Sequence, residues 1–142
     1  MKKKVAYLYV IIIVGCFSCG PKIIQEPIVF DEERSNLTLS YMEGHYGIRQ
    51  EEPTIIPKMI VVHWTEIPTF QKTVDAFYEA NLPEHRNAIA GAGSLNVSSQ
   101  FVVDQDGIIY NLMPETTMAR HVIGLNHCAI GIENVGGSDL PL

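Results

Sequence analysis

The stretch ARHVIGLNHCAIGIENVGG, residues 119–137, contains an apolar strand pattern that ends in one carboxylate, Glu133, and follows a loop with two histidines. A second apolar run, MIVVHWT at 59–65, carries another histidine, His63. Two strands that end in such groups place a metal ligand and a proton-transfer carboxylate on one rim of a sheet. The pattern favours metal-assisted hydrolysis, although these residues alone do not complete a metal site.

Further strand signals surround these two runs. Apolar stretches predict strands at 59–63, of the kind buried on both faces of a sheet, and at 129–135. The segments 98–103 and 108–113 predict a hairpin around the DQDG turn at 104–107.

One helix is predicted within this part of the chain. It opens at Thr69 and runs over 70–81, with Val74, Phe77 and Tyr78 on one face at helical spacing. Residues 85–95 are expected to form a loop. Apolar strands mixed with a hairpin and a helix indicate an α/β domain with a mixed central β-sheet and flanking helices.

The first 19 residues have the pattern of a bacterial lipoprotein signal peptide. Three lysines precede an apolar segment at 5–14 that is too short to span a bilayer, and IVGC at 13–16 resembles a lipobox. We expect export and a lipid anchor on Cys16, with Cys19 as the competing site. An ordinary N-terminal membrane anchor, or a disulfide between the two cysteines, is the alternative.

Residues 20–56 are interpreted as a tether and a lead-in helix. The helix is predicted to start at Asp31 and to end near Gly44 or Gly47. His45 lies beside this helix end, where a histidine usually caps carbonyl groups or packs.

Length and composition limit the function classes. A chain of 142 residues allows one domain, and 46% hydrophobic with 18% charged residues permits a buried core. The formal net charge of −6 makes nucleic acid an improbable partner.

Three blocks carry a resemblance to a known family. VVHWTE at 61–66, NVSSQFVVDQDGIIYNLMPE at 96–115 and the opening stretch occur together in the order found in N-acetylmuramoyl-L-alanine amidases. These zinc amidases are related to phage amidase lysozymes and peptidoglycan recognition proteins. The resemblance covers 57–142, about the first two thirds of such a domain. It implies that the C-terminal part of the fold, with the second and third zinc ligands, lies beyond Leu142.

The resemblance also implies roles for individual residues. His63 matches the first zinc ligand, and Glu133 matches the general base and acid. His121 is assigned to substrate binding or oxyanion stabilisation, and Asn126 to hydrogen bonding with peptide or sugar. His121 is the first alternative zinc ligand to test.

Three other positions are given no catalytic role. Some relatives use a hairpin tyrosine where this chain has Ser99, so Glu133 has no obvious competitor. Gln100 stands where a histidine is often found, which weakens a substrate contact there. Cys128 precedes a buried strand and is expected to behave as a small hydrophobe.

The resulting hypothesis is an exported, membrane-anchored lipoprotein that cleaves the amide between N-acetylmuramic acid and the L-alanine of the peptidoglycan stem. Its cofactor is Zn²⁺ and its partner is peptidoglycan or muropeptides. A non-catalytic peptidoglycan-binding module of the same fold is the alternative from another class. A zinc peptidase acting on peptide crosslinks is a third.

The end of the sequence carries a further expectation. Ser138 and Asp139, with Pro141 in the first turn, look like the start of a helix. We therefore predict that these residues alone bind zinc weakly, do not hydrolyse peptidoglycan and expose an apolar patch beside the last strand.

Overall fold

The computed structural model describes residues 20–137 of the chain. It contains five strands and four helical segments within that range: β1 (Ile23–Gln25), α1 (Glu32–Tyr46), β2 (Met59–Trp64), α2 (Phe70–Tyr78), the 3₁₀ turn η1 (Glu84–Arg86), α3 (Asn87–Ala90), β3 (Phe101–Val103), β4 (Ile109–Asn111) and β5 (Ala129–Asn134).

The strands form one mixed sheet in the order β1-β4-β3-β5-β2. β2 pairs with β5 in parallel along all six residues of each strand, and β5 also pairs in parallel with β3. β3 and β4 form an antiparallel hairpin, whereas β1 adds to β4 in parallel. The predicted α/β fold with a mixed sheet is thereby confirmed.

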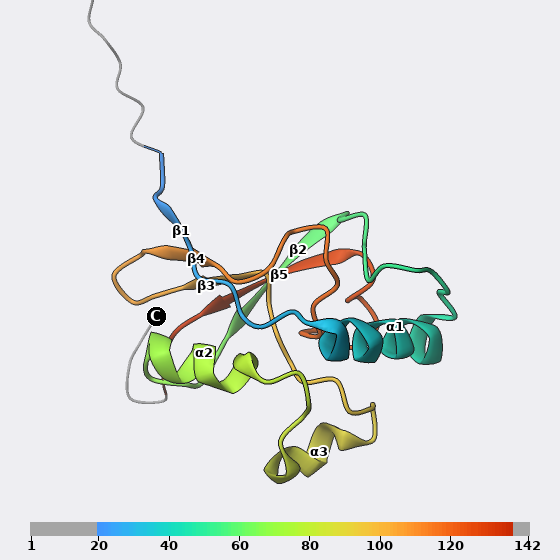
Figure 1. Cartoon of the computed structure of the whole chain (residues 1–142). Coiled ribbons are helices and arrows are strands. Elements are labelled where there is room, and N and C mark those ends of the chain that lie inside the picture. The colour runs from blue at the N-terminus through green and yellow to red at the C-terminus, as the bar shows by residue number, and fades with distance from the viewer. Residues whose placement is uncertain (1–19, 138–142) are drawn as a thin grey trace, which may run out of the picture.

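The helix α1 has the ends that its sequence predicts. The side chain of Asp31 accepts a hydrogen bond from the backbone N–H of Arg34, and Gly47 closes the helix in the left-handed conformation at φ 66°. From within α1, Arg34 donates through Nη2 to the carbonyl oxygens of Phe77 and Tyr78. This buried guanidinium joins α1 to the end of α2. Figure 1 shows both helices on one side of the sheet, with α3 projecting furthest from it.

Two apolar clusters fill the space between helices and sheet. In the first, Val74 and Phe77 of α2 pack with Val102 of β3 and with residues from the neighbouring loops. In the second, Tyr41 and Met42 of α1 pack against residues that precede β2 and β5. The α1 helix is thus part of the domain core.

The strand at 59–63 was predicted to be buried on both faces, and this prediction is wrong. Among the described residues, β2 lies at the sheet edge with β5 as its one partner, and its Ile60 and Val62 are 60% and 66% exposed. An apolar run indicates a strand but does not fix its position within the sheet. Ile60 and Val62 belong to the strand next to β5, so the expected apolar patch beside the last strand is present among the described residues.

The structure also corrects the helix at 70–81. α2 ends at Tyr78, and the side chain of Tyr78 is 45% exposed while Val74 and Phe77 are buried. The predicted loop at 85–95 overlaps the end of η1 and contains the short helix α3.

Residues 23–25, expected within a tether, form strand β1 and extend the sheet. The lipid anchor on Cys16 or Cys19 and the helix start at Ser138 lie outside the described residues. Within 20–137, the structure has no helix with the length and hydropathy needed to cross a membrane.

Candidate active site

The parallel pairing of β2 and β5 brings the two predicted reactive residues together. His63 and Glu133 are partners in the register, near the carboxyl ends of their strands. Paired residues in neighbouring strands project from the same face of a sheet. The structure therefore places both side chains on one rim, as their positions in sequence predicted.

His63 also meets His121 from the loop before β5. The Nε2 atom of His63 lies 3.0 Å from Nδ1 of His121, with the rings edge-on at 78°. The other nitrogen of His121 lies 3.4 Å from the carbonyl oxygen of Ala129. Because only an N–H can donate to a carbonyl, Nδ1 of neutral His121 is the acceptor and His63 carries the shared proton.

Both histidines are neutral at pH 7. Burial lowers the pKa of His63 below its ordinary value of 6.5. Burial also lowers the pKa of His121, to about 4. The hydrogen bond to Ala129 acts in the opposite direction and raises this pKa, whereas the neighbouring His63 lowers it further. Neutral imidazole is the form that binds zinc and the form that donates one hydrogen bond while accepting another.

Gly131 of β5 makes room for the His121 ring. A Cβ atom at this position would lie 2.7 Å from Cγ of His121, closer than real carbon contacts allow. The backbone N–H of Gly131 donates to the side chain of Gln100, which in turn donates to the carbonyl oxygen of Thr117. The ring of His121 therefore rests directly on the strand backbone.

Glu133 is a carboxylate in a desolvated setting. Burial raises its pKa from an ordinary value of 4.5 to about 7. Its Oε2 atom is buried and has no hydrogen-bond partner among the described residues. A carboxyl group with a pKa near the working pH can both accept and return a proton, which is the requirement for general acid–base catalysis.

Asn126 holds the loop that carries His121. Its Oδ1 accepts hydrogen bonds from the backbone N–H groups of His121 and Val122, and its Nδ2 donates to the hydroxyl groups of Tyr41 and Tyr46. The side chain is fully buried, so all of its polar capacity is used within the protein. The structure thus gives Asn126 a positioning role, while direct substrate contact stays a prediction.

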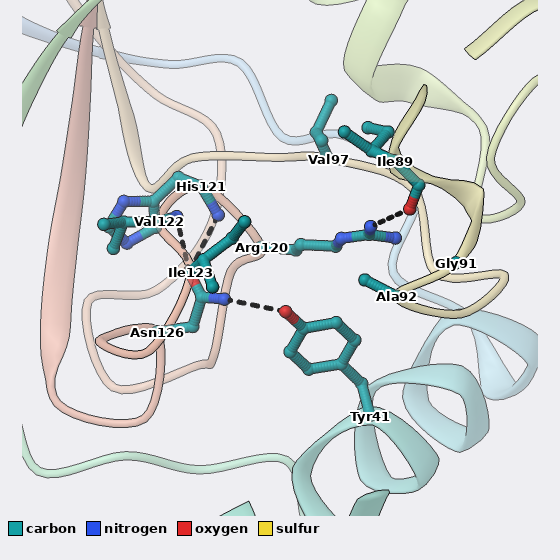
Figure 2. Close-up of a pocket in the computed structure, with 10 residues that line it drawn as sticks. All are labelled: Tyr41, Ile89, Gly91, Ala92, Val97, Arg120, His121, Val122, Ile123 and Asn126. Carbon is teal, nitrogen blue, oxygen red and sulfur yellow. Dashed lines mark hydrogen bonds between the residues drawn. The ribbon is translucent and has the colours of Figure 1, made fainter. Parts of the chain in front are cut away.

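Two cavities adjoin these residues. One of about 200 Å³ is lined by Glu133, His121 and Trp64. The other, of about 380 Å³, lies between α1, the α3 region and the His121 loop and is drawn in Figure 2. Arg120 and His121 line both cavities, so the two form neighbouring compartments of one depression.

A family model described as N-acetylmuramoyl-L-alanine amidase matches residues 50–141. The chain belongs to this family. The matched residues include His63, His121 and Glu133, whereas α1 and Tyr41 lie before them. Among curated proteins, no sequence matches the chain.

The fold of the chain is similar to that of a solved endolysin structure, and two further solved structures are similar at lower scores. A mutant endolysin from Bacillus subtilis is 22% identical with a TM-score of 0.50, covering 86% of this chain and 66% of that one. The amidase LysC from Clostridium intestinale URNW is 23% identical with a TM-score of 0.49, covering 82% and 60%. Bumblebee PGRP-SA is 15% identical with a TM-score of 0.44, covering 82% and 62%. The chain thus spans about 60% of the length of LysC.

The described residues of this chain fit a zinc ion only in part. His63 supplies a neutral imidazole from a strand, which suits a ligand. Catalytic zinc takes three protein ligands, and within 20–137 no three His, Cys, Asp or Glu side chains gather around one point. The predicted second and third ligands lie outside the described residues.

Sequence reasoning did not predict the supporting role of two buried side chains next to this site. Arg120 crosses the larger cavity and Gln100 links β5 to the loop at Thr117; both are buried. Their partners are distant in sequence, so no local pattern marks them. Cys128 is buried and donates only to the carbonyl oxygen of Leu125, in keeping with a small hydrophobe, and His45 contacts the carbonyl oxygen of Ala92 at the end of α1.

Proposed function

We propose that this chain is the amidase part of a peptidoglycan hydrolase that cleaves the amide between N-acetylmuramic acid and L-alanine of the stem peptide. The observation that carries the proposal is Glu133, with a pKa of about 7, on the rim it shares with His63 in a chain of this family. The cavity of about 200 Å³ beside Glu133 gives the scissile amide a place to lie.

Glu133 performs the proton transfers in this proposal. Its ionised form takes a proton from the attacking water, and the acid so formed delivers the proton to the leaving nitrogen of alanine. The unpartnered Oε2 atom is available for this exchange.

His63 and His121 have separate roles. We expect His63 to hold zinc together with ligands from outside the described residues; when bound, zinc lowers the pKa of a water molecule and polarises a carbonyl group. His121 lines both cavities and is neutral; to donate a hydrogen bond to the substrate oxygen, its one N–H must leave the carbonyl oxygen of Ala129. Asn126 keeps its loop in place.

The test uses the full protein with zinc and purified cell walls. Amidase action releases stem peptides with a free amino-terminal alanine from intact glycan, which mass spectrometry detects. A peptidase acting on crosslinks would instead leave the stems attached to muramic acid.

A non-catalytic muropeptide-binding module is the second candidate. The larger cavity, of about 380 Å³, favours this candidate, because Glu133 does not line it. A ligand could therefore occupy this cavity without contacting the reactive carboxylate. Such a module would retain muropeptides and release no alanine-headed stems.

The proposed location is the cell envelope, with a lipid on Cys16 and the domain exported. Cys16→Ser should release the protein from membranes or leave an uncleaved precursor. Lipid labelling that persists in this variant and disappears with Cys19→Ser would move the anchor to Cys19.

A further inference from the structure

The cavity between α1 and the His121 loop contains a buried positive charge. Arg120 is 5% exposed, yet its guanidinium group points into this space (Figure 2). It donates through Nη1 to the carbonyl oxygens of Gly93 and Leu95 and through Nη2 to that of Ile89 at 2.7 Å. Three bonds leave two of its five N–H groups without a partner among the described residues.

No carboxylate neutralises this charge within the described part of the chain. The ion pair recorded there joins Arg49 and Glu43, on the surface. The guanidinium carbon of Arg120 instead lies 5.3 Å from the ring centre of Tyr41, which supplies a cation–π contact. A buried cation paired only with carbonyl dipoles and an aromatic ring retains most of its attraction for an anion.

A second arginine adds positive charge next to Arg120. Arg86 lines the smaller cavity together with Arg120, so the depression holds two arginines against the single carboxylate of Glu133. The protein as a whole carries a formal charge of −6. Positive charge is therefore concentrated where the substrate is expected, and it is not a property of the whole molecule.

The other walls of the larger cavity are apolar. They come from Ile89, Val97 and Ile123 and from the ring of Tyr41. The polar group of Asn126 is used up within the protein, so the cavity offers few partners to the many hydroxyl groups of a sugar. A short peptide with small apolar side chains and one carboxylate matches this lining better.

We propose that Arg120 binds the free carboxylate of the acidic residue that follows the first alanine of the stem peptide, and that the cavity behind His121 is the peptide side of the site. The proposal rests on the proposed function, because it places the peptide beside Glu133. A guanidinium binds a carboxylate through paired N–H groups, which adds direction to the charge attraction.

The experiment compares two muramoyl tripeptides that differ in one group. Both contain L-alanine, a γ-linked D-glutamyl residue and L-lysine; the α-group of the second residue is a carboxylate in one and an amide in the other. Binding to the full protein with Glu133→Gln, which prevents cleavage, is measured by titration calorimetry. We expect the carboxylate form to bind about tenfold more tightly, as one charge-assisted hydrogen bond provides.

Two variants separate charge recognition from support of the 89–95 segment. Arg120→Gln keeps two N–H donors for the three carbonyl oxygens but removes the charge, so the preference should fall to about one, with binding of the amide form retained. Arg120→Lys should keep part of the preference. Circular dichroism reports whether each variant is folded, and the comparison of the two tripeptides in the Glu133→Gln protein leaves Arg120 unchanged.

The outcomes distinguish failure of the carboxylate site from failure of the proposed amidase function. Equal affinity for both tripeptides in the presence of Arg120 would overturn the carboxylate site and leave the amidase proposal standing. Equal weakening of both ligands by Arg120→Gln would show that Arg120 only holds the segment. Failure of both tripeptides to bind would overturn the proposed substrate class itself.

Discussion

Glu133 combines two properties that a proton-transfer residue needs. It lies at the end of a strand whose partner carries His63, and burial raises its pKa to about 7. The same burial has a thermodynamic consequence. A carboxyl group that binds its proton more tightly in the folded state destabilises that state once it is forced to ionise.

Glu133→Gln is therefore expected to stabilise the fold at alkaline pH. The wild type loses the contribution of Glu133 as pH rises from the unfolded pKa of 4.5 through the folded pKa of about 7, whereas glutamine does not titrate. The pKa difference corresponds to at most about 3–4 kcal/mol, and screening of a partly buried group reduces this to about 1–2 kcal/mol. Urea unfolding should show this gain at pH 8 and almost none at pH 4. A constant difference across that range would contradict the raised pKa.

The pH dependence of hydrolysis tests the same group through its chemistry. As a base, Glu133 works when ionised, so kcat/KM should rise with pH through about 7 and level off above it. Rates of stem release from pH 5 to 9 provide the profile. A limb centred near the ordinary carboxyl pKa of 4.5 would show that burial does not govern the base.

At the scale of elements, β5 must present a bare backbone to the His121 ring. Gly131→Ala places a Cβ within 2.7 Å of that ring, so the ring or the strand must move. We expect a loss of about 1–3 kcal/mol in the free energy of unfolding and a shift of the imidazole NMR signals of His63 and His121. Gly44→Ala in α1 is the matched control, because nothing lies within 4 Å of its added Cβ. It should be neutral or stabilising by about 0.5–1 kcal/mol.

Local signals explain which elements the sequence predicted. Asp31 and Gly47 mark both ends of α1 because capping involves only neighbouring residues. The three residues of β1 lack such a signal, since their place depends on pairing with β4 far along the chain. The exposure of β2 likewise follows from strand order, which its apolar run does not encode.

The residues of the site likewise fall into those that local sequence patterns predicted and those that they did not. His63 and Glu133 were predicted because each ends an apolar run in a family motif, and their register brings them together. Arg120 was not predicted, because its partners lie 25 to 31 residues away along the chain. The positioning role of Asn126 depends on Tyr41 and on a loop fold that no local pattern specifies.

At the scale of the whole molecule, zinc binding requires His63 together with ligands from outside the described residues. His63→Ala in the full protein is expected to lower zinc content and to abolish hydrolysis, because a ligand on the strand is lost. His121→Ala should reduce hydrolysis while zinc remains. Metal analysis of the two purified variants checks both; zinc lost from His121→Ala and retained by His63→Ala would exchange their roles.

The central claim is that Glu133 carries out proton transfer in an amidase. The most direct measurement is the rate at which the zinc-loaded full protein and its Glu133→Gln variant release alanine-headed stems from muropeptides, followed by mass spectrometry. The account predicts release by the wild type and a loss of roughly 10² to 10⁴ in the variant, with zinc content and muropeptide binding unchanged. Near-normal release by Glu133→Gln would contradict it.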